Sequence, residues 1–80
     1  MDLKTFVSAH RGVHSAKHGD GFIYIGRDQA DRWWMSWKEE DTVLDCGIGE
    51  KNFEKAKAEA HAQVDGGKTC TLKLKWTKAS

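Results

Sequence analysis

Three short apolar segments follow one another in the middle of the chain, and short polar stretches separate them. They are FIYIG (22–26), RWWMSWK (32–38) and TVLDCGI (42–48). Short runs rich in β-branched and aromatic residues, bounded by glycine and acidic residues, are typical of strands joined by hairpin connections. The segments therefore predict an antiparallel meander.

A helix is expected directly after this meander, over residues 50–64. Apolar side chains recur there at three- and four-residue steps, at Phe53, Ala56, Ala60 and Val64. The sequence Asp-Gly-Gly follows, and glycine readily adopts the left-handed conformation that ends a helix. The small alanines predict that this helix lies close to a sheet.

The segment CTLKLKW (70–76) alternates strictly between apolar and polar residues. This period of two predicts a half-buried strand, with Thr71, Lys73 and Lys75 on its outer side. The expected order is β-β-β-α-β within a single small domain of 80 residues. We therefore predict an α+β fold, in which one α-helix packs on a small antiparallel β-sheet.

The N-terminal segment has two interpretations. Residues 3–18 could form a helix that begins after Asp2 and presents Leu3, Phe6 and Val7 on one side. Alternatively, KTFVS (4–8) could form a first strand that pairs with FIYIG and is followed by irregular chain. Gly12 would cost about 1 kcal/mol relative to alanine inside a helix, which favours the strand.

Three of the four tryptophans fall in the stretch DRWWMSWK (31–38). Successive strand residues face opposite sides, so Trp33, Met35 and Trp37 should share one face and Trp34 should lie on the other. We expect the first set to meet the helix in a core with a further group of apolar residues, namely Ile23, Ile25, Leu44, Cys46, Leu72, Leu74 and Trp76.

The opposite face of the sheet is expected to carry aromatic and basic side chains. Its predicted members are Tyr24, Trp34, Arg32, Lys38, Lys73 and Lys75, flanked by Phe22 and Val43. If the N-terminal segment is not a helix, nothing covers this face, and exposed aromatics of this kind mark binding surfaces. If it is a helix, it could fold over Trp34 and form a second small core.

Catalytic and cofactor motifs are missing from the sequence. There is no phosphate-binding loop and no nucleophile elbow, so we expect no enzymatic activity and no cofactor. His10, His14 and His18 recur every four residues, and a helix could bring two of them to one metal ion. On a strand the same spacing separates them by about 13 Å, and no metal site is predicted.

Charge and cysteine content narrow the range of partners. The net charge of +1 argues against a strongly electrostatic nucleic-acid binder, although acids concentrate in residues 28–50 and lysines in residues 66–80. The two cysteines form no CxxC motif, and MDLKTF lacks the apolar run of a signal peptide. We therefore expect a cytoplasmic protein with no membrane association.

These observations favour a small non-enzymatic protein-binding domain. Its size and lack of motifs are typical of accessory or inhibitor proteins of phages and mobile elements that bind a host protein. Trp34 and Tyr24 would be its anchors, because interface hot spots favour Trp, Tyr and Arg. The alternative is a single-stranded nucleic-acid-binding module that uses the same aromatic and basic face. That face could also form a homodimer.

Overall fold

The computed structural model describes residues 3–18, 21–37, 40–44, 47–49, 52–64 and 70–79. Its elements follow one another along the chain as α1 (Leu3–Ala9), β1 (Arg11–His18), β2 (Gly21–Arg27), β3 (Trp33–Trp37), β4 (Glu40–Leu44), α2 (Asn52–Gln63), η2 (Thr71–Lys73) and β5 (Trp76–Lys78). Asp2, Lys38 and Cys46, which the sequence assigned to a helix start, the binding face and the core, lie outside the described residues.

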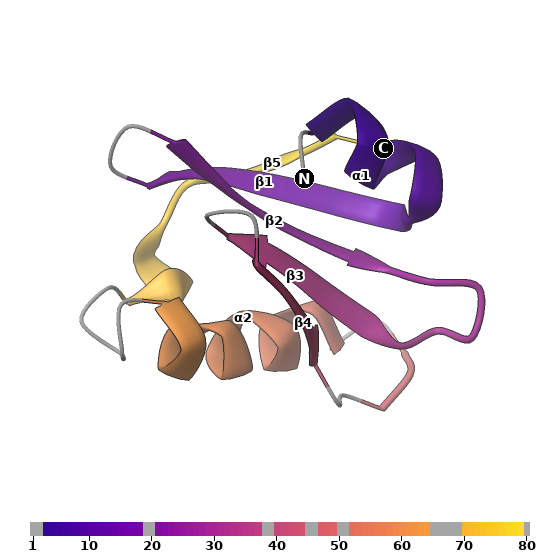
Figure 1. Ribbon diagram of the computed structural model, residues 1–80. Helices are drawn as coiled ribbons and strands as arrows, with labels where there is room; N and C mark the ends of the chain where they lie inside the picture. The colour runs from indigo at the N-terminus through magenta and orange to yellow at the C-terminus, as the bar shows by residue number, and fades with distance from the viewer. Residues whose placement is uncertain are drawn as a thin grey trace.

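The strands form one five-stranded antiparallel sheet in the order β4-β3-β2-β1-β5. Strands β1 to β4 are a meander, and the connection through α2 carries the chain from β4 to the far edge, where β5 pairs with β1. Helix α2 lies along one face of the sheet, and α1 lies against the other (Figure 1). The predicted α+β fold with an antiparallel sheet is confirmed, and a second helix is added to it.

The main core lies between the sheet and α2. Its buried residues are Ile23, Ile25, Trp33, Met35, Leu44, Ala56, Ala60 and Val64, with Trp37, Phe53, Leu74 and Trp76 packed at its margin. The predicted helix stripe is therefore confirmed in full, as is the placement of Trp33, Met35 and Trp37 on the face that α2 covers. Alanine at two stripe positions leaves room for the large side chains of β3.

The N-terminal segment combines parts of both interpretations. It forms a short helix and then a strand, but the strand is residues 11–18 and not KTFVS, so the favoured prediction was wrong in position. Gly12 adopts a φ of +61°, and the β1–β2 register shifts between Arg11 and His14. Glycine adopts a positive φ at little energetic cost. Gly12, which argued against a long helix, therefore lies at the irregularity near the start of β1.

The prediction of a strand over residues 70–76 was also wrong. Residues 71–73 form a short 3₁₀-helix, and the strand begins only at Trp76. Thr71, expected outside, is fully buried and donates a hydrogen bond from Oγ1 to the carbonyl of Lys57 in α2, whereas Leu72, expected in the core, is 49% exposed. The alternation of residue types could not reveal that Thr71 is hydrogen-bonded to α2, which keeps residues 71–73 out of the sheet.

None of the described helices combines the length and apolar character that crossing a membrane requires.

Candidate functional site

The face of the sheet turned away from α2 is here called the outer face. In the antiparallel ladder Lys17 lies opposite Phe22, Tyr24 lies opposite Ser36, and Trp34 lies opposite Val43. Directly opposite residues project to the same side of a sheet, and alternate residues of one strand do so too. The register therefore places Tyr24, Trp34, Phe22 and Val43 together on the outer face, as the sequence predicted.

Helix α1 covers one corner of the outer face. Phe6 is fully buried there, with its ring 5.8 Å from that of Tyr24. The absence of a side chain at Gly26 lets Phe6 and Val13 pack directly on the backbone of β2. A Cβ atom at residue 26 would lie 2.8 Å from Val13 Cγ2 and 3.0 Å from Phe6 Cε1. The corner is thus a second, small core, which the helical interpretation of the N-terminus had anticipated.

Trp34 lies at the border of this covered corner and is half-buried. The ring of His10, directly after α1, is 6.0 Å from its indole. The indole Nε1–H donates a 2.7 Å hydrogen bond to Asp28 Oδ2. Trp34 is therefore held by the protein itself, which reduces the freedom it would have as a binding anchor.

Asp28 organises the turn between β2 and β3. Its Oδ1 accepts hydrogen bonds from the backbone N–H groups of Ala30 and Arg32, and its Oδ2 accepts from the side chains of Arg32 and Trp34. The Trp34 indole, followed by these backbone donors and the Arg32 charge, lowers the pKa of Asp28 to about 2. A carboxylate with this many donors stays ionised and fixes both the turn and the indole.

Phe22 lies on the part of the outer face that α1 leaves open, and the half-buried Tyr24 lies between it and the covered corner. Phe22 is 52% exposed, and its ring stacks beside that of Tyr24 with centroids 6.4 Å apart and planes inclined by 14°. Val43 on β4 is 42% exposed. We call the surface formed by Lys17, Phe22, Tyr24, Trp34 and Val43 the outer patch.

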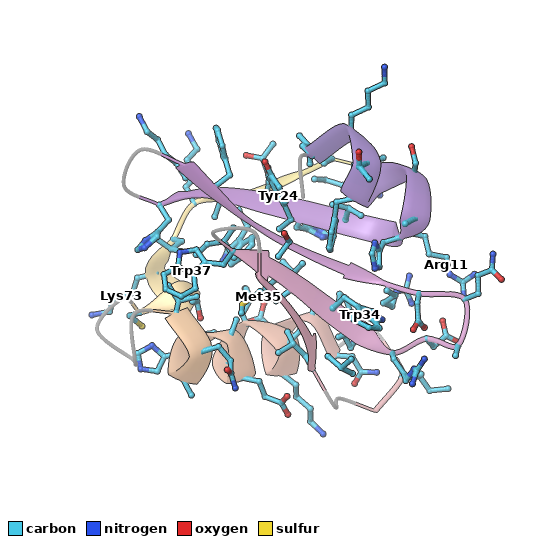
Figure 2. The ribbon with its side chains drawn as sticks, viewed as in Figure 1. Arg11, Tyr24, Trp34, Met35, Trp37 and Lys73 are labelled. Carbon is cyan, nitrogen blue, oxygen red and sulfur yellow. The ribbon has the colours of Figure 1, made fainter. Side chains whose placement is uncertain are left out.

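The structure brings only some of the predicted binding residues to this patch. Arg32 is exposed beside Trp34 and forms an ion pair with Asp28 at 3.2 Å. Lys73 belongs to η2 near the end of α2 and lies well apart from Tyr24 and Trp34 (Figure 2), so its predicted place on the outer face was wrong. Lys75 is exposed just before Trp76, which pairs with Ala16, and so lies at the Lys17 end of the sheet.

From the sequence, Lys17 was not assigned to the binding face, and Phe22 was placed only beside it. Lys17 belonged to the ambiguous N-terminal segment. The signal that could have found them is the HGDG turn, because a hairpin closed there pairs His18 with Gly21 and hence Lys17 with Phe22. Phe22 is then the outward residue closest to the turn.

The three histidines predicted as metal candidates contact different aromatic rings. His10 stacks on Phe6, His14 on Phe53 and the ring of His18 approaches that of Trp37. Across the described part of the chain, no three His, Cys, Asp or Glu side chains form a group that could hold a metal ion.

A hollow of about 190 Å³ lies between the end of α1 and the β2–β3 turn. Its lining residues are Ser8, Ala9, His10, Arg11, Arg27, Asp28 and Gln29. Arg11 forms an ion pair with Asp31 at 2.7 Å, Asp28 is saturated by its donors, and the Arg27 guanidinium lies 5.6 Å from the centre of the Trp33 ring. Arg11 and Asp28 are thus engaged within the protein, whereas Arg27 Nε is buried without a hydrogen-bond partner among the described residues. The outer patch, where Phe22 and Val43 are exposed, is the better candidate site.

Comparison of the chain with protein-family models, curated proteins and solved structures finds no match.

Proposed function

We propose that this chain is a small non-enzymatic module that binds another protein through the outer patch. The observation that carries the proposal is the exposure of Phe22, which is 52% accessible while stacked on Tyr24 over a part of the sheet that neither helix covers. Burying a fully exposed side chain of this size contributes about 1.5–3 kcal/mol, and about half of that remains available at the half-exposed Phe22. Aromatic residues, phenylalanine among them, are enriched in the buried centres of protein interfaces.

The anchor residues differ from those that the sequence favoured. Trp34 is already hydrogen-bonded to Asp28 and approached by His10, so we assign it a supporting role at the border of the patch. Phe22 and Tyr24 become the anchors, and Arg32 becomes a residue of the turn. As part of the same proposal, the chain acts in the cytoplasm as an accessory or inhibitor protein of a phage or mobile element, a role based on its size and motif-poor sequence.

A photo-crosslinking amino acid at position 22 tests this proposal in an extract of the cells that produce the protein. The matched control carries the same crosslinker at Leu72, which is 49% exposed in η2 next to α2. Protein adducts from position 22 that are absent from position 72 are expected. Equal adducts from both positions, or none from position 22, would contradict the proposal.

Single-stranded nucleic acid is the second candidate ligand, because Lys17 lies directly opposite Phe22 and could meet a phosphate while a base stacks on the ring. The same experiment separates the candidates, since position 22 would then form nucleic-acid adducts. Salt provides a second criterion. Phosphate binding weakens steeply as salt rises, by about 0.7 logarithmic units of affinity per tenfold salt for each neutralised phosphate.

A further inference from the structure

The fold separates the charges of the chain more sharply than the sequence does. The described residues 3–18, 21–27 and 70–79, which form α1, β1, β2, η2 and β5, contain no Asp or Glu. Their basic residues are Lys4, Arg11, Lys17, Arg27, Lys73, Lys75 and Lys78. Asp2 and Asp20 lie outside the described residues. We call this part of the molecule the basic half.

All acids among the described residues belong to the other half, in the β2–β3 turn, β4 and α2. They are Asp28, Asp31, Glu40, Asp41, Glu54 and Glu59. Several of them are neutralised nearby, as in the 2.7 Å ion pair between Lys57 and Glu54. In the basic half, by contrast, Arg11 is the one cation that forms an ion pair with another described residue. The basic half therefore carries positive charge that the described part of the protein leaves uncompensated.

The open end of the outer patch lies within the basic half. Lys17 faces the exposed ring of Phe22 across the ladder, and it is exposed itself. Lys75 is exposed at the same end of the sheet, because the next residue, Trp76, pairs with Ala16 beside Lys17. An apolar anchor point therefore lies next to cations on β1 and before β5. A ligand at this end can bury an apolar side chain against Phe22 and place negative charge beside the two lysines.

We infer that the partner of the outer patch presents an acidic protein segment that contains an aromatic or large aliphatic side chain. This inference rests on the proposed function and specifies its partner. The apolar side chain would cover Phe22 and Tyr24, and carboxylates that extend from it toward β1 and β5 would meet Lys17 and Lys75. Complementary charge of this kind mainly sets partner choice and association rate, while the buried anchor supplies affinity.

Two observations favour a protein segment over a nucleic acid. The outer patch continues from Phe22 to Val43, an aliphatic side chain that gives a base no ring to stack on. A strand of phosphates that followed the face from β5 to β4 would also pass from the basic half to the half that holds all the described acids. A short peptide segment can end before that boundary. Electrostatic attraction of a long polyanion to a chain with a net charge of +1 is correspondingly small.

Fluorescence anisotropy with three labelled probes tests the inference on the full chain. The probes are a short random copolymer of glutamate and tyrosine, a poly-glutamate peptide of the same length, and a short oligothymidylate. The copolymer is expected to bind most tightly, and Phe22→Ala should weaken it about tenfold, the loss of a moderate interface anchor. Lys17→Glu should weaken it to a similar extent and reduce the salt dependence. Leu72→Ala is the matched control and should change nothing.

Each other result would overturn the inference. Tighter binding of oligothymidylate would identify a nucleic-acid site, and equal binding of poly-glutamate that survives Phe22→Ala would show charge attraction without an anchor. Self-association that Phe22→Ala abolishes would identify a second copy as the occupant, and binding of none of the probes would remove the acidic partner. Circular dichroism of each variant separates these results from misfolding. Crosslinking from position 22 to a protein segment without acids would overturn this inference while leaving the proposed function intact.

Discussion

The neighbouring residues Trp33 and Trp34 show that the two faces of the sheet are covered to different extents. Trp33 is 4% exposed in the main core, where its ring lies 5.9 Å from that of Phe53 in α2. Trp34 projects to the outer face, is half-buried, and needs Asp28 as a hydrogen-bond partner. One position of shift along a strand thus separates a core residue from a residue at the border of an open surface.

The cause of this difference is the cover that each face receives. Helix α2 has 12 residues and lies along its face, whereas α1 has 7 residues and reaches one corner. Phe6 and Val13 form a small core below α1, and beyond it Phe22 and Val43 remain exposed. The same alternating strands thus form a buried face below the longer helix and a partly exposed face beside the shorter one.

The largest change in the free energy of unfolding is expected from a substitution on the face that α2 covers. Ile25→Ala removes a fully buried side chain below α2 and should lower the free energy of unfolding by about 2–5 kcal/mol. Val43→Ala on the outer face should change it by no more than about 0.5 kcal/mol, because that side chain is 42% exposed. Urea denaturation measures both values. A comparable loss for the two variants would mean that the outer face is covered in solution.

A smaller loss of stability is expected from a substitution in the corner that α1 covers. Gly26→Ala places a methyl group against Val13 and Phe6 and should cost about 1–3 kcal/mol through overpacking. Amide hydrogen exchange should accelerate in α1 and remain unchanged in α2. Gly21→Ala is the matched control, since a Cβ atom there meets nothing within 4 Å. If α2 were to exchange faster as well, the two cores would behave as one unit.

The smallest effect concerns pH and the α2 side of the sheet. His14 stacks on Phe53 at 4.0 Å, and burial, followed by the charges of Lys78 and Lys57, lowers its pKa from the usual 6.5 against the opposing effect of the Gly12 carbonyl. Since the unfolded chain binds the proton more readily, the free energy of unfolding should fall as the pH drops below 6.5.

His14→Gln should remove this part of the acid sensitivity. Urea denaturation of the protein and the variant at about pH 7.5 and about pH 5.5 measures the difference between their pH slopes. Identical slopes would show that the stacked imidazole accepts its proton without disturbing the contact with α2. The comparison between the faces would then concern packing alone.

The local periodicity of apolar residues predicted the elements that pack against segments close to them in sequence. The meander, the stripe of α2 and the division of Trp33, Trp34 and Met35 between two faces all follow from periods of two or of three and four residues. Long-range contacts decided the rest. Thr71 bonds to α2, so the alternating segment CTLKLKW begins as a 3₁₀-helix, and β1 rather than KTFVS pairs with β2, because KTFVS lies in α1 and buries Phe6 against the sheet.

The candidate site divides in the same way. The alternation of residues along β2 and β3 was enough to predict that aromatic side chains project from the face opposite α2, because successive strand residues face opposite sides. Which of these side chains stay accessible depends on packing between segments that are distant in the chain. Helix α1 approaches Trp34 through His10 and leaves Phe22 open, and the pairing of β1 with both β2 and β5 brings Lys17 and Lys75, 58 positions apart in sequence, to the same end of the sheet. Such contacts depend on non-local packing and pairing, which no local pattern encodes.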